Sequence, residues 1–243
     1  MPSLDTSRWR FPDPSSADRD GLVGFGADLE PATLLHAYRQ GIFPWPHPGV
    51  PLPWFSPDPR GVIWPDRLRV SRSLRQRLRN CGWETTVDAA FETVITACAE
   101  HERPEGTWIV PEMRAAYLRL HELGQVHSVE VWHRGALVGG LYGVGLGGVF
   151  TGESMFHRVT DASKVALVDL VDRLVEAGGR LVDVRLVTDH LASLGAEPMR
   201  RHEYLRLLYG LRDQPVRLPR ERRPVARLAP AAGGGAGPAR EVP

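Results

Sequence analysis

Cysteine is scarce in this sequence, and long apolar runs are absent. Its 243 residues include two cysteines, Cys81 and Cys98, which are too few for a disulfide framework, so reduced thiols are the simplest interpretation. No apolar run approaches the roughly 20 residues that a membrane-spanning helix needs, and the first residues show no apolar signal core. These absences predict a cytoplasmic protein with no membrane partner.

An excess of charge of either sign is also missing. Thirty basic residues face 29 acidic ones, which gives a net charge of +1, so only local clustering of charge could indicate a nucleic-acid partner. The nine histidines show no metal-ligand spacing. His121 and His127 are too far apart for one helical face and have no cysteine partners. The sequence therefore predicts no metal site.

What is present is enough apolar material for a core, since 42% of the residues are hydrophobic. Composition divides the chain into an extended lead-in (1–20), a small N-terminal domain (21–65), a larger domain (66–212) and a disordered tail (213–243) rich in Pro, Gly, Ala and Arg. Residues 41–65 combine many prolines with five large aromatic rings, so they are ordered but not helical. They form either a loop packed over a core or the wall of a cleft.

Residues 66–79 carry six arginines and one aspartate. Ser71 can cap a helix here, with Leu74 and Leu78 facing inward. Another face carries three basic side chains at helical spacing, Arg72, Arg75 and Arg79. This face is either simply solvated or a contact for the phosphates of a nucleic acid, and the lack of interleaved acidic residues favours phosphate contact.

The middle of the chain has a pattern typical of an antiparallel meander. Residues 128–132 alternate like a strand, Arg134-Gly135 makes a turn, and glycine-broken strands follow over 137–150. A helix with apolar residues at helical spacing begins near Asp161 and ends at Gly178. Together these patterns predict an α+β fold with a mostly antiparallel central sheet and flanking helices.

Two places in this region suggest chemistry. Glu153 follows Gly152 at an expected strand-loop-helix junction, where we expect its carboxylate to be exposed, as a solvated loop residue or as part of a site. Asp183 and Arg185 share one face of a strand expected over residues 181–187. Two charges on a buried strand indicate either an internal ion pair or a functional site.

Two familiar motifs are present only in part. Residues 143–148 match G-x-G-x-x-G, but strand-like Val149 and Phe150 follow where the dinucleotide fingerprint needs a helix. GESMF (residues 152–156) lacks the flanking glycines of a G-x-S-x-G elbow, so Ser154 is a poor nucleophile candidate. We therefore expect neither a dinucleotide cofactor nor a covalent route.

A series of longer motifs is specific in its order. They are GIFPWPHPGVPLPWFSPDPRGV (41–62), TWI (107–109), AYLRLHELGQVHSVEVW (116–132), LVGGLYGV (137–144), GESMF (152–156), ASK (162–164) and DHLASLGA (189–196). In this order they closely resemble the leucyl/phenylalanyl-tRNA-protein transferases, over roughly Leu22 to Leu208. The expected order of meander, helix and strand likewise resembles the acetyltransferase (GNAT) fold, to which that family is related.

The resemblance implies an aminoacyltransferase that needs no cofactor. Its donor would be aminoacyl-tRNA charged with Leu or Phe, less readily Met, and its acceptor the α-amino group of a protein that begins with Arg or Lys. The product would carry a destabilising N-terminus and be degraded by the N-degron route. Because an aminoacyl ester is already activated, the enzyme needs positioning and charge stabilisation rather than a metal.

Site residues follow from the matching motif positions. The resemblance associates Trp45 and Trp108 with the 3′-terminal adenosine of the tRNA, and assigns Met155, Leu141 and Val182 to the pocket for the transferred side chain. Glu153 and Asp183 match the acidic site positions, where they would bind the acceptor amine and receive or relay its proton. Arg185 stands where the family usually has Gln, so a role in the proton relay is in doubt, since Arg has no acceptor oxygen.

Two other functions compete with this interpretation. An acetyl-CoA-dependent N-acetyltransferase would share the fold, but the Q/R-x-x-G-x-G/A turn that cradles pyrophosphate is missing. A non-catalytic RNA-binding module would explain the basic helix. It would leave Glu153, Asp183 and the aromatic segment without a role.

Overall fold

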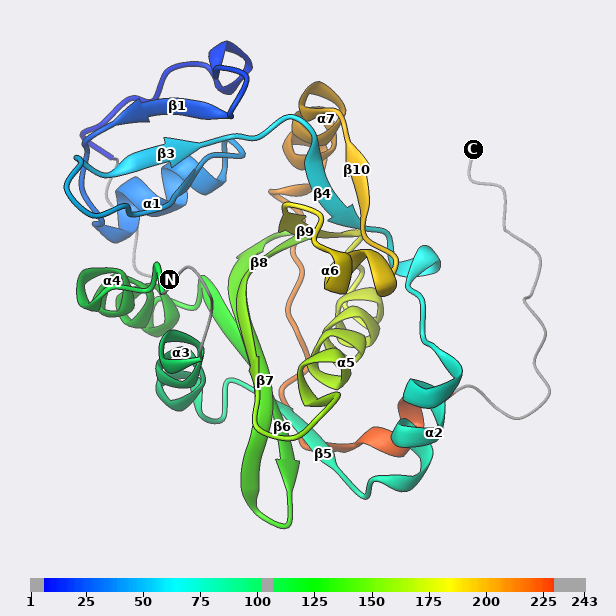
Figure 1. The fold of residues 1–243 in the computed structure, drawn as a ribbon. Coiled ribbons are helices and arrows are strands. Elements are labelled where there is room, and N and C mark those ends of the chain that lie inside the picture. Colours follow the sequence, from blue (N-terminus) through cyan, green and yellow to red (C-terminus); the bar gives the residue numbers. More distant parts are fainter. Residues whose placement is uncertain (1–6, 102–106, 230–243) are drawn as a thin grey trace.

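The structure is a computed structural model that describes residues 7–101 and 107–229. In this part of the chain the strands form two sheets (Figure 1). The smaller sheet has the order β1-β3-β2, from β1 (Leu22–Phe25), β2 (Phe43–Pro44) and β3 (Pro53–Phe55). It packs with α1 (Pro31–Tyr38), which begins at a proline.

The larger sheet has eight strands, in the order β10-β4-β9-β8-β7-β6-β5-β11. Along the chain these are β4 (Arg60–Ile63), β5 (Glu84–Val87), β6 (Val126–His133), β7 (Ala136–Leu146), β8 (Val149–His157), β9 (Leu181–Arg185), β10 (Glu197–Met199) and β11 (Arg223–Pro224). All neighbours run antiparallel except β8 and β9, which are parallel. The expected meander is therefore present as β6-β7-β8.

Helices cover both faces of the larger sheet (Figure 1). One face carries α3 (Phe91–Glu100) and α4 (Pro111–Glu122), and the other carries α5 (Ala162–Glu176). The remaining helices are α2 (Arg72–Asn80), α6 (Asp189–Ser193), α7 (Arg201–Leu211) and the short turns η1 (Pro14–Ser16), η2 (Pro65–Arg67) and η3 (Val225–Leu228). The expected α+β architecture, with a mostly antiparallel sheet and flanking helices, is confirmed.

The 15 residues of α5 connect β8 to its parallel neighbour β9. The order of meander, helix and strand is therefore the one on which the expectation of an acetyltransferase-like domain was based. β4 lies inside the segment assigned to the small domain, yet it pairs with β9 and β10 in the larger sheet. None of the helices within residues 7–101 and 107–229 is both long and apolar enough to cross a membrane.

The predicted disorder of the tail is wrong for residues 213–229. β11 pairs with β5, Val225 is fully buried, and Arg227 bonds to the buried carboxylate of Asp169. Asp169 also pairs with Arg173 at 2.7 Å, so the segment closes a charge network on α5. The bulk composition of 213–243 hid these few anchoring residues, and residues 230–243 lie outside the described part of the chain.

Candidate active site

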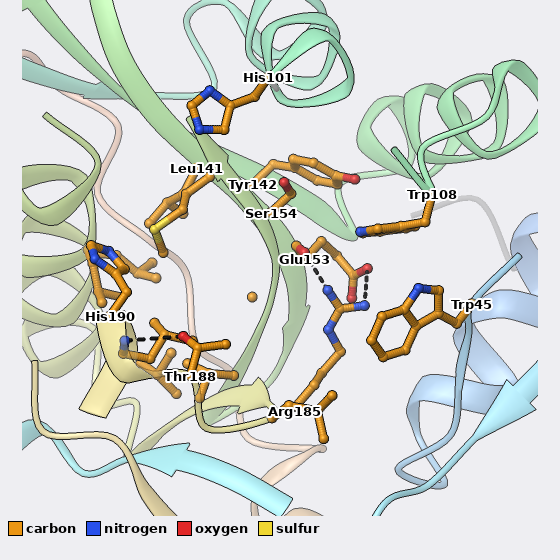
Figure 2. Close-up of a pocket in the computed structure, with 18 residues that line it drawn as sticks. Trp45, His101, Trp108, Leu141, Tyr142, Glu153, Ser154, Arg185, Thr188 and His190 are labelled. Atoms are coloured by element: carbon orange, nitrogen blue, oxygen red, sulfur yellow. Dashed lines mark hydrogen bonds and ion pairs between the residues drawn. The ribbon is translucent and has the colours of Figure 1, made fainter. Parts of the chain in front are cut away.

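A cavity of about 410 Å³ opens where β8 and β9 separate (Figure 2). Their parallel pairing runs from Val149 opposite Leu181 to Thr151 opposite Asp183. Beyond that point the two strands line the cavity with Gly152, Glu153, Ser154, Met155, Val184 and Arg185, and Val182 lines it from within the paired stretch. The edges of two strands that no longer pair with each other leave backbone and side chains available to a ligand.

Bulges in both strands explain why they separate here. In β8 the partner of Tyr142 is Ser154 and the partner of Gly143 is Gly152, so Glu153 is an extra residue without a partner. In β9, Val184 is the extra residue between the positions paired with β4. A bulge re-aims the side chain of the bulged strand. It turns Glu153 toward α4, whereas Met155 packs with the cluster on the α5 face.

The expectation that Glu153 is exposed on a loop is therefore wrong. GESMF lies inside β8, and the Glu153 side chain is fully buried. One carboxylate oxygen, Oε2, accepts from the Tyr117 hydroxyl at 3.1 Å and from the Arg185 guanidinium at 3.2 Å. The other, Oε1, is buried and accepts no hydrogen bond from any residue that the structure describes.

Burial raises the pKa of Glu153 above its ordinary value. The charge of Arg185 and the hydroxyls of Tyr38 and Tyr117 oppose this rise without cancelling it. Those two hydroxyls also bond to each other. The result is a buried carboxylate with one unpartnered oxygen and a pKa above its ordinary value.

Arg185 lies between Glu153 and two aromatic rings. Its guanidinium carbon is 5.1 Å from the centre of the Phe43 ring and 5.0 Å from that of Trp108. The guanidinium also donates to the backbone carbonyl of Glu153. Figure 2 shows the Arg185 side chain reaching from β9 to Glu153, beside the rings of Trp45 and Trp108. Three kinds of contact fix its position.

Asp183 does not pair with the Arg185 side chain. Its carboxylate accepts hydrogen bonds from Nε (2.8 Å) and Nη2 (2.7 Å) of Arg60 and from the hydroxyl of Tyr204 (2.8 Å). Burial alone would raise the pKa of Asp183, but the charge and hydrogen bonds of Arg60 hold it below its ordinary value. Asp183 does not line the cavity; its link to Arg185 is a bond from that residue's backbone N–H at 2.9 Å.

The two tryptophans expected at the site both line the cavity. Trp45 follows β2 in the smaller sheet, and Trp108 lies shortly before α4. Both are half-buried, so each ring keeps an accessible surface. Figure 2 shows them on the same side of the cavity as Glu153 and Arg185. Trp45 contributes to the wall of a cleft, as one of the two interpretations of the proline-rich segment held.

The three expected pocket residues also lie on the cavity. Met155, Leu141 and Val182 line it, and sequence reasoning missed the other apolar side chains around them. These are Leu167 and Leu170 of α5, Leu186, and Leu191 of α6. Leu167 and Leu170 were recognised only as helix core, because helical spacing does not tell whether a side chain packs against a sheet or a ligand.

The arginine-rich helix has the form predicted for it but lies away from the cavity. The Ser71 side chain accepts from the N–H of Leu74, and Leu74 and Leu78 are buried. The three basic residues named from the spacing, Arg72, Arg75 and Arg79, are exposed and are not in the cavity wall. In Figure 1, α2 lies at the end of the molecule opposite the smaller sheet.

Sequence reasoning also missed the polar residues behind the cavity. These are Tyr38, Tyr117, Tyr142, Arg60 and Tyr204. A tyrosine at an apolar position of a helix or strand was the available signal, because a buried hydroxyl calls for a partner. In the described part of the chain, no group of three or more His, Cys, Asp or Glu side chains is arranged to hold a metal ion.

Comparison with known proteins agrees with this geometry. The family model for leucyl/phenylalanyl-tRNA protein transferase matches residues 62–209, and the model for the N-terminal domain of the same family matches residues 27–58. A transferase of this name from Chromohalobacter salexigens is 56% identical over 219 residues, which is 89% of this chain and 86% of that protein. One from Nitratidesulfovibrio vulgaris is 52% identical over 216 residues, 88% of this chain and 92% of that protein.

Among solved structures, a GCN5-related N-acetyltransferase from Kribbella flavida covers 67% of this chain with 58% of its own. The identity is 14% and the TM-score 0.38, which is too low to support an argument. The two family models and the long, highly identical relatives establish the family of this chain. This chain belongs to the leucyl/phenylalanyl-tRNA-protein transferases, a family of aminoacyltransferases.

Proposed function

We propose that this chain transfers leucine or phenylalanine, and methionine less readily, from aminoacyl-tRNA to the α-amino group of proteins that begin with Arg or Lys. The new first residue would mark the acceptor for N-degron degradation in the cytoplasm, where aminoacyl-tRNA is available. One observation carries the proposal: a single cavity is lined by apolar side chains, a buried carboxylate residue with an unpartnered oxygen, and two tryptophan rings.

The donor is proposed to bind along this cavity. The 3′-terminal adenosine stacks on Trp45 and Trp108, since base–aromatic stacking tolerates any base and is worth about 1 to 3 kcal/mol. The transferred side chain enters the apolar lobe at Met155, Leu141 and Val182, where an unbranched thioether adapts to both Leu and Phe. Further along the tRNA, the phosphates contact Arg72, Arg75 and Arg79 of α2.

The chemistry needs one bond made, one broken and one proton moved. The neutral α-amino nitrogen of the acceptor attacks the ester carbonyl carbon, and the tetrahedral intermediate then loses the ribose oxygen of the tRNA. The nitrogen gives up a proton, which the ribose oxygen finally takes up. Glu153 Oε1 is proposed to accept this proton; its lack of a partner among the described residues supports the assignment.

Arg185 and Asp183 support Glu153 in different ways. The charge of Arg185 opposes the rise of the Glu153 pKa and so favours the ionised form that a base needs. Asp183, for which the family resemblance suggested direct contact with the acceptor, is a buried residue of β9 and is proposed to position Arg185 through its backbone N–H. An aminoacyl ester is activated without a cofactor, and none is invoked.

The test is a transfer assay with separately charged tRNAs. Leucyl-, phenylalanyl- and methionyl-tRNA are each mixed with peptides that begin with Arg, Lys or Ala, and the N-terminal residue of the product is identified by mass spectrometry. An Arg-started peptide with an acetylated α-amino group is the matched control, because it keeps the side chain and lacks the nucleophile. Transfer to the free Arg- and Lys-started peptides, with little to the Ala-started peptide and none to the acetylated control, supports the proposal; no transfer from any charged tRNA overturns it.

A further inference from the structure

The charges around the cavity cancel in pairs. Two carboxylates and two guanidinium groups meet at β4, β8 and β9, as Arg60 with Asp183 and Arg185 with Glu153. Both side chains of the first pair are buried, with exposed fractions of 1% for Arg60 and 0% for Asp183. The second forms the cavity wall, where Arg185 keeps 13% of its side chain exposed. The carboxylate that faces the cavity therefore already carries a positive charge of the protein's own.

Local structure holds Arg185 in this place. Its backbone lies in the left-handed region, with φ of 65°, beside the bulge of β9, and its N–H is bonded to Asp183. Left-handed backbone is unfavourable for a side chain as large as arginine, so surrounding contacts must maintain it. Those contacts are the Glu153 carboxylate and the rings of Phe43 and Trp108. Arg185 is thus built into the site rather than loosely placed at its edge.

Glu153 has room for one more hydrogen-bond donor. Oε2 accepts from Tyr117 and Arg185, whereas Oε1 is buried and has no hydrogen-bond donor among the described residues. The α-amino group of an acceptor can use that oxygen. A second cation, such as the side chain of an N-terminal Arg or Lys, then finds no unpaired oxygen on Glu153 and meets the charge of Arg185 nearby.

We propose that Arg185 is a specificity-determining residue that occupies the place on Glu153 where an acceptor cation would otherwise bind, so that this chain selects its acceptor with little regard to positive charge on the first side chain. The inference rests on the proposed function and refines its acceptor class. Arg- and Lys-started proteins remain acceptors, but uncharged first residues of similar shape are used comparably. With Gln at this position, as the resemblance leads one to expect, Glu153 is left as an unbalanced anion that attracts such cations.

Two peptides that differ by one charge test this inference. One begins with Arg and the other with citrulline, which has nearly the same shape and no charge, and kcat/KM is measured for both with leucyl-tRNA. The wild-type ratio of Arg to citrulline is expected to be within about threefold of one. Arg185→Gln is expected to raise the ratio about tenfold or more, because an unbalanced carboxylate in a partly buried site attracts cations strongly. Arg185→Lys keeps the charge and should keep the wild-type ratio.

Controls separate this effect from general damage. Arg114→Gln removes the same charge from the pair that Arg114 of α4 forms with Glu92 of α3 at the surface, and should leave the ratio unchanged. Thermal unfolding of each variant shows whether it is folded, and Arg185→Lys gives an answer even if Arg185→Gln unfolds. A wild-type ratio far above one, or an equal ratio in wild type and Arg185→Gln, overturns the inference and leaves the transferase activity standing. Absence of transfer to any peptide overturns the proposed function itself.

Discussion

Arg60 and Asp183 are 123 residues apart in the sequence, yet they form a two-pronged ion pair with N–O distances of 2.8 and 2.7 Å. Neither side chain has more than 1% of its surface exposed. The pair joins neighbouring strands β4 and β9, and the hydroxyls of Tyr204 in α7 and Thr151 in β8 bond to the same carboxylate. Four elements therefore meet at Asp183, next to the point where β8 and β9 separate.

In this arrangement the main role of Asp183 is to stabilise the fold. Asp183→Asn would leave the Arg60 guanidinium buried without a countercharge, so we expect the free energy of unfolding to fall by about 3 to 5 kcal/mol. Urea denaturation at neutral pH measures the change. Asp20→Asn is the matched control, because that carboxylate is 78% exposed and should change stability by less than about 0.5 kcal/mol. A loss below about 1 kcal/mol for Asp183→Asn would contradict the structural role.

Local patterns in the sequence predicted the elements well. Ser71 was expected as a cap and Leu74 and Leu78 as the inward face of one helix, and the structure confirms all three. The meander over β6, β7 and β8 was equally visible. Such features depend on residues three or four apart in a helix, or two apart in a strand, and this spacing can be read directly from the chain.

The sequence predicted several of the residues that line the cavity but not how the charged residues pair. Alternation along a strand assumes an unbroken ladder, and the bulge at Glu153 breaks it at the very residue that matters. The pairing of Asp183 with Arg60 instead of with Arg185 depends on the order of β4 and β9 in the sheet, which no local pattern encodes. The tail was misjudged for a similar reason, since Val225 and Arg227 find their partners on distant elements.

The apolar lobe gives a prediction for the donor. Met155→Ala removes a thioether from the wall of the cavity, and a lost contact in an apolar pocket is worth about 1 to 3 kcal/mol. We expect kcat/KM for leucyl transfer to fall by about 10- to 100-fold, while affinity for tRNA itself changes little. Met199→Ala on β10 makes the same chemical change outside the cavity wall and should retain activity. Equal leucyl transfer by Met155→Ala and wild type would remove Met155 from the proposed pocket.

The arginine-rich helix gives a prediction that depends on salt. Replacing Arg75 and Arg79 together with Gln should weaken binding of every charged tRNA about equally, since phosphate contacts carry no base information. The slope of log affinity against log salt should become shallower by about one to two units. Replacing Arg19 and Arg206, which are exposed on other elements, removes the same charge and serves as the control. An unchanged slope for the α2 variant would mean that this face is only solvated.

The raised pKa of Glu153 predicts the acid side of the pH profile. A base must be ionised to accept a proton, and the acceptor amine must itself be neutral, so two protons are lost on the way to the reactive state. Below the pKa of Glu153, log kcat/KM should therefore rise with pH at a slope of about two, and above it at about one. Glu153→Gln should leave a slope of about one throughout, together with a lower rate.

Arg185 fixes where that change of slope falls. Burial raises the pKa of Glu153 and the charge of Arg185 opposes the rise, so Arg185→Gln should move the break to higher pH. The raised pKa of Glu153 also makes the stability of the folded protein depend on pH. The folded protein holds the Glu153 proton more tightly than the unfolded chain does, so the stability that this proton provides is present at low pH and is lost as the pH rises through the raised pKa. Kinetics and urea denaturation over roughly pH 5 to 8 test both statements, and a break that stays in place or moves to lower pH in Arg185→Gln would show that Glu153 is not the group that titrates.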